Sequence, residues 1–571
     1  MQSQKLKRNF LPETFTVTNW QTLEPYFKNL LDDEVHSAEE LQLWMRNRSE
    51  LESIINEDMA WRYINMNCDT TDEKLAESFE FFVTEIEPNI APFTDKLNKK
   101  LISNSFVNQL PKGKYDIYLR GLKRSIELFR EENIPLAVEI NKLQQEYGKV
   151  CAAMTVEIDG ETMTLQKAAK HLESTNREHR KMVYEKIAER RLQDKNVLDE
   201  QLNNLIELRQ NIAANAGYNN FRDYMHDELG RFDYSIQDCF NFHEAIKEVA
   251  MPVMNYLSDE RKAELQVDTL RPYDLAVDPS NLPPLKPFDT ATELTEKTIE
   301  AFNTIDTYFG SCINTMQKMQ YLNLDSRIGK APGGFMYPLM ESGVPFIYMN
   351  SVGSQNDLIT MVHEGGHAIH SFLCVPLELA SFKNPPSEVA ELASMSMELM
   401  SMEHWDTFFK NRDDYKRAKI DQLEKVLETL PWVAAVDKFQ HWMYENKNHT
   451  NQQRKDAWVK IVTDYNPTNL DFTGYQENLS YQWQKQLHIY EVPFYYIEYG
   501  MAQLGAIAVW RNYKTNPQKT IEQYKAALSL GYTVGIKDIY AAAGIKFDFS
   551  KAYVKELIDF VFDELKVLKN V

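Results

Sequence analysis

Apolar residues recur at helical spacing along most of the chain. An early case begins at Ser37, which forms with Glu40 the Ser-x-x-Glu pattern of an N-terminal capping box. The apolar positions that follow are those of one helix face: Leu41, Trp44, Met45, Leu51, Ile54 and Ile55. Residues 114–153 continue this texture, with a break expected near Pro135 because proline disrupts a helix interior. These stretches predict a largely helical N-terminal region.

One short segment departs from the helical pattern. The pair Asp159-Gly160 lies between apolar residues that alternate with polar ones, namely Val156, Ile158, Met163 and Leu165. An Asp-Gly pair between alternating segments is a strong signal for a two-residue hairpin turn. We expect a small β-hairpin here, near the junction of two lobes, which we place at residues 1–195 and 196–571.

Strand-like texture is otherwise scarce. Its clearest instance in the second half is residues 344–349, Val-Pro-Phe-Ile-Tyr-Met. Elsewhere the spacing of apolar residues favours helices, and no internal repeat or low-complexity tract interrupts them. The fold is therefore predicted to be mostly α, with a small β element.

The composition allows a large core and narrows the class of partner. Of 571 residues, 43% are hydrophobic and 12% aromatic. No run approaches the roughly 18 apolar residues of a membrane span, and residues 1–20 lack the apolar centre of a signal peptide, so we expect a cytoplasmic protein. A net charge of −21 argues against nucleic-acid and membrane partners but leaves short peptides. Monomer and homodimer both stay open.

The cysteines do not form a recognisable site. They are odd in number and scattered without a Cys-x-x-Cys pair, at Cys68, Cys151, Cys239, Cys312 and Cys374. This distribution argues against a disulfide framework and against a thiolate zinc site. We expect reduced, structural cysteines.

The most informative motif is His363-Glu364-Gly365-Gly366-His367. On a helix, positions i and i+4 share a face, so both imidazoles can reach one metal ion. The carboxylate between them can then serve as the general base toward water, which is the chemistry of the His-Glu-x-x-His zinc hydrolases. The spacing therefore predicts metal-assisted hydrolysis.

The local sequence supports a helix at this motif, with one anomaly. Ser354 and Asp357 can form a capping box ahead of an apolar run. Two consecutive glycines inside a helix cost about 1 kcal/mol each relative to alanine. Gly365 and Gly366 therefore need a reason, and we expect another element to approach the helix closely there.

Catalytic zinc takes three protein ligands, so a third must come from elsewhere. The metzincin continuation requires a glycine and a histidine at set positions after His367, and the chain lacks them. A glutamate from a following helix is the other common solution. Such a helix is expected after Pro385-Pro386, with Ser387 as its N-cap. It carries three candidates, Glu388, Glu391 and Glu398.

The segment from His363 to His370, together with the segment from Glu391 to Glu398, resembles the thimet oligopeptidase and oligoendopeptidase F family of zinc peptidases. The oligoendopeptidase F branch is the more similar. The resemblance implies one zinc ion per chain, held by the two histidines of the motif and by Glu391, with Glu388 as the competing assignment. It also implies that Glu398 orients a zinc-binding imidazole, and it leaves His370 outside the site. It covers about residues 200 to 571 well.

A dense aromatic segment, residues 488–500, offers groups for the transition state. It contains one histidine and four tyrosines, and by itself it fits an aromatic core helix as well as an active site. The resemblance implies catalytic roles for His488, Tyr496 and Tyr499. Tyr495 and Tyr490 are the alternatives.

Two further segments resemble substrate-binding parts of the same family. The glycine-rich residues 327–335 match no phosphate-binding loop, and residues 344–350 resemble a strand whose open edge could pair with a peptide backbone. The implied substrate-binding residues are Gly333, Gly334, Phe346 and Tyr348.

The resemblance implies a two-lobed helical fold with a deep central channel and a small β element beside the active-site helix. The expected activity is that of a zinc-dependent oligoendopeptidase, a metalloendopeptidase that hydrolyses internal bonds of short unfolded peptides. Glu364 would be its general base. Two alternatives stay open, a dipeptidyl carboxypeptidase-type exopeptidase and a non-catalytic peptide-binding relative.

Overall fold

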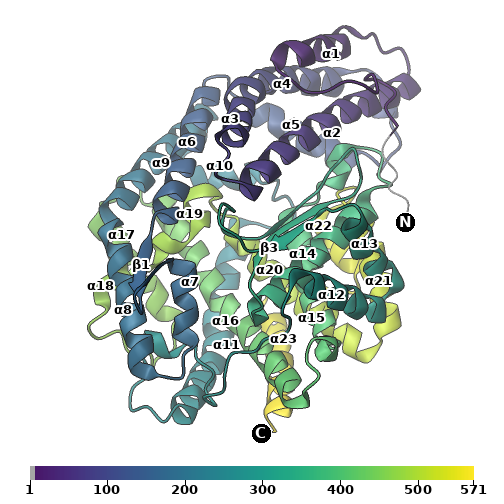
Figure 1. Ribbon diagram of the computed structural model, residues 1–571. Coiled ribbons are helices and arrows are strands. Elements are labelled where there is room, and N and C mark those ends of the chain that lie inside the picture. The colour runs from purple at the N-terminus through teal and green to yellow at the C-terminus, as the bar shows by residue number, and fades with distance from the viewer. Residues whose placement is uncertain (1–6, 571) are drawn as a thin grey trace.

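Helices make up most of the computed structural model, which describes residues 7–570. We expected residues 1–20 to lack a signal peptide. Residues 1–6 of that segment lie outside the described part. Two small sheets accompany the helices, one of two strands and one of three. The prediction of a mostly α fold is confirmed (Figure 1).

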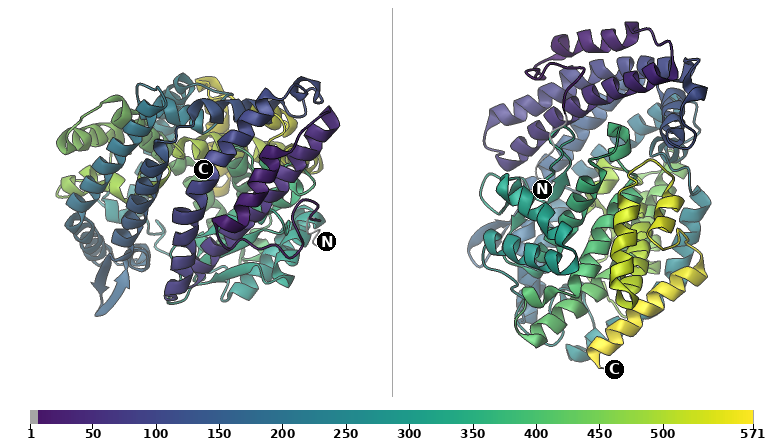
Figure 2. Two further views of the ribbon diagram at one scale, coloured as in Figure 1. Left: turned by 90° about the horizontal axis from the view of Figure 1, so that it is seen from above. Right: turned by 90° about the vertical axis from the view of Figure 1, so that its right-hand side faces the viewer.

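The N-terminal helices form a layer over the rest of the molecule, at the top of Figure 1 and of the right-hand view in Figure 2. They are α1 (Trp20–Asp32), α2 (Ala38–Cys68), α3 (Glu73–Phe81), α4 (Glu87–Ser103) and α5 (Asp116–Leu128). Ser37 caps α2 as predicted, since its side chain accepts from the Glu40 backbone N–H. This layer has its own hydrophobic core, to which the distant residues Leu379 and Phe382 contribute.

The remaining helices share one continuous core that runs from Tyr147 to Leu565. The first group is α6 (Asn133–Ala152), α7 (Leu165–Ala169), α8 (Arg177–Gln193), α9 (Lys195–Asn215), α10 (Phe221–Glu228), α11 (Ile236–Glu264), α12 (Ala291–Ile305) and α13 (Thr307–Lys318). The second group is α14 (Gln355–Cys374), α15 (Ser387–Met402), α16 (Arg412–Glu445), α17 (Asn451–Asp464), α18 (Gln476–Ser480), α19 (Leu487–Glu491), α20 (Tyr496–Thr515), α21 (Pro517–Leu528), α22 (Ile536–Ala542) and α23 (Lys551–Lys569).

The predicted hairpin is present. Strand β1 (Thr155–Ile158) pairs antiparallel with β2 (Glu161–Thr164). The two turn residues, Asp159 and Gly160, have φ angles of 52° and 81°, as a type I′ turn requires. The expected break at Pro135 lies earlier, between α5 and α6, and Pro135 occupies the first turn of α6, where its missing N–H breaks no helical hydrogen bond.

The three-stranded sheet corrects one expectation. Strand β5 (Phe346–Ser351) lies in the centre, parallel to β3 (Leu322–Asp325) and antiparallel to β4 (Phe335–Tyr337). Both edges of β5 are therefore paired, and the strand that we expected to have an open edge has none. The open edges belong to β3 and β4, neither of which the sequence had indicated as a strand.

Helix α15 packs against both α14 and α20. The capping box at the start of α14 is confirmed, because Ser354 and Asp357 bond to each other's backbone N–H. A Cβ atom on Gly366 would lie 2.6 Å from the Ser394 Cα atom of α15. The expected close approach at the paired glycines is confirmed as well. The N-cap of α15 is Pro386 rather than Ser387, so the predicted side-chain cap there was wrong.

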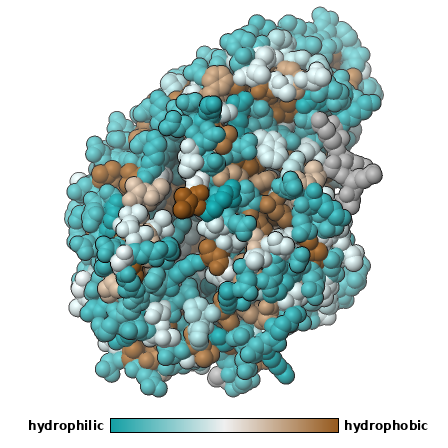
Figure 3. Space-filling model, viewed as in Figure 1, coloured by the Kyte–Doolittle hydropathy of each residue, from teal (hydrophilic) through white to brown (hydrophobic). Residues whose placement is uncertain are grey.

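On the face shown in Figure 3, the surface is hollowed between the helices on the left and those on the right. The lobes placed at residues 1–195 and 196–571 stay a prediction. Within residues 7–570, no helix combines the length and apolar character that a membrane crossing needs.

The contact at Gly366 gives a stability prediction. Gly366→Ala should lower the free energy of unfolding by about 1–3 kcal/mol, because the added methyl group meets the backbone of α15. Gly148→Ala in α6 is the matched control: nothing lies within 4 Å of its Cβ position, so it should stabilise by roughly 0.5–1 kcal/mol. Denaturant unfolding followed by circular dichroism measures both. Equal stability of the two variants would contradict the packing argument.

Candidate metal centre

Three side chains that could hold a metal ion converge where α14 meets α15. His363 and His367 lie one helical turn apart on α14, with ring centroids 4.8 Å apart. The Oε2 atom of Glu391 on α15 lies 3.4 Å from the Nε2 atom of His363 and 3.6 Å from that of His367. The ligand atoms of all three residues lie within 4.8 Å of one another. This arrangement brings together the three residues named from the sequence.

Each imidazole is oriented through its other ring nitrogen. The Nδ1 atom of His363 lies 2.7 Å from Oε1 of Glu398, and the Gln422 amide donates to Oε2 of that carboxylate at 2.8 Å. The ring of His367 hydrogen-bonds the backbone of Ala390. With Nδ1 of His363 engaged by the Glu398 carboxylate, Nε2 is the ring atom that faces Glu391.

The carboxylate of Glu391 is also held by hydrogen bonds. Its Oε1 atom accepts from the Tyr495 hydroxyl at 2.9 Å, and its Oε2 atom accepts from the Ser394 hydroxyl at 3.1 Å. The Ser394 contact explains why serine follows Glu391 by three positions, one turn along the same helix face. Tyr495, which we considered as a donor to the substrate, donates instead to the Glu391 carboxylate.

The pocket favours a positive charge. Burial disfavours the charged form of His363, yet hydrogen bonds to Glu391 and Glu398 outweigh it and hold the His363 pKa well above its ordinary value. Burial alone would raise the pKa of Glu391, but the attraction of His367 and His363 lowers it to about 2. Two imidazoles and a carboxylate, with orienting partners behind them, are the donor set that zinc takes in hydrolases. The residues present therefore fit a zinc ion.

Glu364 lies beside these ligands on α14 and is buried. Burial raises the pKa of Glu364 to about 7; His363 opposes this rise and Glu391 adds to it. Its carboxylate accepts a hydrogen bond from the backbone of Met336 in β4. The same contact places the edge strand β4 next to the metal centre.

His488 on α19 faces Tyr499 on α20, with Nε2 of the imidazole 3.4 Å from the tyrosine hydroxyl. The Trp432 indole donates to Oε1 of Gln486, so the Gln486 amide nitrogen faces Nδ1 of His488 at 2.8 Å. An amide nitrogen only donates, so Nδ1 accepts and the proton of the neutral ring is on Nε2. Burial lowers the pKa of His488 to about 4, which keeps the ring neutral near pH 7.

The tyrosines of the aromatic segment lie in different places relative to His488. Tyr496 and Tyr499 pack around His488, with ring centroids 4.8 and 5.6 Å from the imidazole. Burial raises the pKa of Tyr499 well above its usual value, and the charges of Glu391 and Glu364 raise it further, so its hydroxyl stays protonated beside the metal centre. Tyr490 is fully buried and donates to the Leu198 carbonyl, which removes it from the site.

Two other residues near the motif are held by partners outside the three candidate ligands. Glu388, the competing ligand, is buried on α15 and accepts from the Tyr234 hydroxyl at 2.6 Å, away from the imidazoles. His370 is buried, and it hydrogen-bonds the backbone of Leu528. Neither belongs to the group of metal-capable side chains at this centre.

The residues expected to bind substrate lie in and around the three-stranded sheet. Gly333 and Gly334 precede β4, and a Cβ atom added at Gly334 would lie 3.4 Å from the backbone oxygen of Tyr348 in β5. The side chains of Phe346 and Tyr348 are buried, and Tyr348 donates to the Ala331 and Asn67 carbonyl groups. Both side chains are used in packing, and the substrate-binding role of Phe346 and Tyr348 stays a prediction.

Several positioning residues escaped the sequence reasoning, notably Gln422, Gln486 and Trp432. Each is a common residue type without a motif, and each reaches the centre from a helix or turn distant in sequence from its partner. Met336 acts through its backbone, which leaves no signature in the side chain. No local pattern could have revealed them.

Comparison with known proteins supplies the family. The model of peptidase family M3 matches residues 170–558, and the model of the peptidase M3 N-terminal domain matches residues 10–129. The chain belongs to peptidase family M3. The two matches leave residues 130–169, which include the hairpin, outside either model.

Relatives within the family are distant in sequence. The oligoendopeptidase F homolog of Borreliella burgdorferi is 23% identical over 340 residues, which cover 58% of this chain and 56% of that protein. The chromosomal oligoendopeptidase F of Lactococcus lactis subsp. cremoris is 22% identical over 393 residues, 66% of this chain and 61% of that protein. The matched segments thus span less than two thirds of these curated relatives.

Solved structures match over almost the whole chain. The structure described as PZ peptidase A with inhibitor 2 has a TM-score of 0.92 at 26% identity and covers 97% of this chain and 99% of its own. Oligoendopeptidase-F from Enterococcus faecium has a TM-score of 0.65 at 15% identity, with 96% and 97% covered. The second likeness establishes the fold alone.

The orienting role of Glu398 gives a prediction for this M3 chain. Glu398→Ala should weaken zinc binding by about 10–100-fold, because His363 loses the carboxylate that directs its Nε2 atom. Glu398→Gln keeps an oxygen acceptor, so its zinc affinity should lie between those of wild type and Glu398→Ala. Competition with a chromophoric chelator measures the affinities, and Glu207→Ala, on an exposed position of α9, is the control. Zinc affinity unchanged in Glu398→Ala would refute the role.

Proposed function

We propose that this M3 chain is a zinc-dependent oligoendopeptidase that hydrolyses internal bonds of short unfolded peptides. The proposal rests on the convergence of His363, His367 and Glu391, with the buried Glu364 beside them. His363, His367 and Glu391 would hold the metal. Zinc bound there supplies a Lewis acid that polarises the scissile carbonyl and acidifies water. The names of the oligoendopeptidase F relatives support the same activity.

Glu364 is the proposed general base. Its burial raises its pKa to about 7, close to the operating range of a group that must both take up and release a proton near neutrality. The hydrogen bond from the Met336 backbone keeps the carboxylate beside the ligands. Glu364 would accept the proton of the attacking water and pass it to the leaving amine.

His488 and Tyr499 are the proposed donors to the oxygen that becomes negative in the transition state. His488 carries its proton on Nε2, which faces the Tyr499 hydroxyl, and the Tyr499 hydroxyl stays protonated. Donors held in place by packing stabilise developing charge without having to reorganise. Tyr496 packs against both rings and is proposed to position them.

The substrate is proposed to pair with β4, because no strand among residues 7–570 pairs with its second edge and its Met336 backbone contacts Glu364. Addition of an extended peptide to a sheet edge requires an unfolded substrate. The hollow in Figure 3 is the proposed entrance to a channel that excludes folded proteins. A cytoplasmic location stays a prediction from the sequence, as does the absence of nucleic-acid partners.

The first test is cleavage of a peptide set that varies in length and in blocked termini. Zinc-loaded protein should cleave short peptides internally, including peptides blocked at the C-terminus, and a chelator should abolish this. Glu364→Gln should reduce turnover by at least about 10²-fold while retaining zinc, because an amide cannot accept the proton. Mass spectrometry of the products and metal analysis measure both effects.

The matched control is Glu207→Gln, which changes the same chemical group at an exposed position of α9 and should leave turnover unchanged. Full turnover of a zinc-loaded Glu364→Gln variant would exclude Glu364 as the base. Cleavage confined to peptides with a free C-terminus would identify an exopeptidase. Peptide binding without cleavage by zinc-loaded wild type would identify a binding protein.

A second test concerns the oxyanion donors. His488→Ala and Tyr499→Phe should each lower kcat by about 10²–10³-fold with little change in KM, since their hydrogen bonds strengthen only in the transition state. Tyr256→Phe, at an exposed tyrosine of α11, should behave as wild type. Steady-state kinetics on one fluorogenic peptide provide both constants. A rise in KM at constant kcat would instead assign these groups to ground-state binding.

A further inference from the structure

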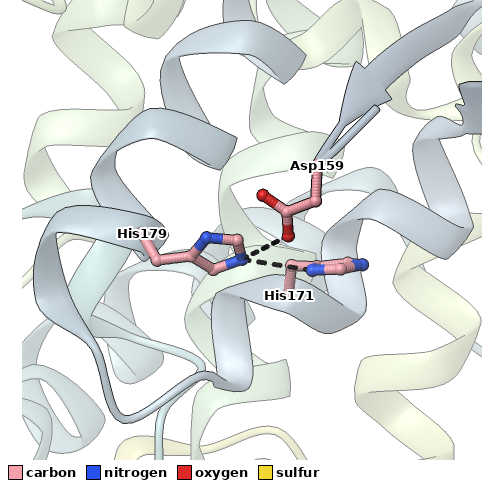
Figure 4. A group of neighbouring side chains, drawn as sticks. All are labelled: Asp159, His171 and His179. Carbon is pink, nitrogen blue, oxygen red and sulfur yellow. Dashed lines mark hydrogen bonds and ion pairs between the residues drawn. The ribbon is translucent and has the colours of Figure 1, made fainter. Parts of the chain in front are cut away.

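A second group of metal-capable side chains lies outside the active site, at the tip of the β1–β2 hairpin. Figure 4 shows that Asp159 from the hairpin turn, His171 from the short 3-10 helix η3 (Lys170–Glu173) and His179 from the first turn of α8 point toward one another. One ligand atom from each residue lies within 4.8 Å of the other two. Three separate segments of backbone thus direct their donors to one point.

The spacing of the donor atoms suits a single metal ion. The Nδ1 atom of His171 lies 3.1 Å from the Nε2 atom of His179, and that nitrogen lies 4.0 Å from Oδ2 of Asp159. Two nitrogens bound to one zinc ion at about 2.0–2.1 Å in tetrahedral geometry are separated by about 3.3 Å. The pair of imidazoles therefore has almost the separation that one ion imposes, and the carboxylate needs to move only slightly.

Hydrogen bonds among the three residues do not satisfy all of their polar atoms. The Nε2 atom of His179 faces both His171 and Asp159, but a ring nitrogen has one proton or one lone pair and can serve only one of them. Among residues 7–570, no lysine or arginine forms an ion pair with Asp159. A divalent cation would engage all three donors at once and would balance the carboxylate charge.

The backbone holds the ligands in position without the metal. Asp159 has a left-handed conformation set by the type I′ turn, with φ of 52°. The backbone N–H of His179 donates to the Asn176 side chain, which caps α8, so the position of this residue does not depend on its imidazole. Ligands fixed in this way lose little freedom on binding, which favours affinity.

Another group of metal-capable side chains outside the active site, within the described residues, is Cys239, Asp437 and His441. It differs from the hairpin group in how easily an ion could reach it from solvent. Those residues are buried in the core, and Asp437 already bonds the Nε2 atom of His243 at 2.7 Å. The side chain of Asp159 is 66% exposed and that of His179 is 20% exposed, so an ion can enter from solvent and retain water in its remaining positions.

We propose that Asp159, His171 and His179 form a second metal site that binds a divalent transition metal and fastens the hairpin turn to the start of α8. Two imidazoles and one carboxylate select zinc, copper or nickel over magnesium or calcium. The site is separate from the catalytic ligands and does not depend on the proposed peptidase activity. Its metal would restrain the β1–β2 hairpin, which lies outside the residues that the two M3 family models match.

The test counts metal ions. Full-length wild type, already loaded at the catalytic centre, is titrated with zinc and examined by native mass spectrometry. Wild type should bind one zinc ion more than Asp159→Asn, His171→Ala or His179→Ala. Asparagine tolerates the left-handed turn, so Asp159→Asn removes the carboxylate and preserves the hairpin. His36→Ala, which removes an exposed histidine elsewhere, is the control and should bind as wild type does.

The same samples report on restraint of the hairpin. Zinc should slow amide hydrogen exchange in residues 155–164 of wild type at least severalfold, and it should have no such effect in His171→Ala or His179→Ala. An equal zinc count in wild type and all three site variants would overturn the proposal, as would loss of the extra ion in His36→Ala. Extra zinc without slower exchange would overturn the fastening role. Peptide cleavage by the site variants should stay at the wild-type rate, which separates this test from that of the peptidase.

Discussion

The contact between α14 and α15 at Gly366 is the constraint on which the metal centre depends. With no side chain at this position, the two helices approach until a Cβ atom would meet the Ser394 Cα atom at 2.6 Å. At this separation the carboxylate of Glu391, one turn before Ser394, reaches both imidazoles of α14. A larger residue would separate the helices and leave three polar groups apart. The cost of glycine inside a helix is therefore offset by the geometry of the site.

Hydrogen bonds from further helices then orient what this contact brings together. Glu398 on α15 and Gln422 on α16 align His363, and Tyr495 at the start of α20 holds Glu391. Helix α20 also carries Tyr499 toward the charges of Glu391 and Glu364. The proposed metal ligands and the proposed oxyanion donors are thus connected through α15 and α20, so a displacement of either helix would disturb both.

Local signals predicted the elements well where the cause is local. The capping box at Ser354 and the Asp159-Gly160 turn depend on residues at most three positions apart, and both occur as expected. The boundary at Pro135 and the cap at Ser387 were placed less well, because several nearby residues can end or begin a helix. Strand order was not predictable, since β5 gains its two neighbours from segments on either side of a glycine-rich loop.

The sequence alone determined which chemistry was available: two histidines on one helix face, a carboxylate between them, and paired glycines that indicated a close neighbour. The family resemblance added Glu391, Glu398 and the histidine–tyrosine group. Only the tertiary structure decided that Glu391 rather than Glu388 faces the imidazoles, and that Tyr495 serves the ligand while Tyr499 faces His488. Glu388 and Glu391 lie within one turn of each other on α15, and Tyr495 and Tyr499 lie about one turn apart at the start of α20. Which member enters the site depends on how that helix is rotated against its neighbours, and packing across the whole core sets that rotation.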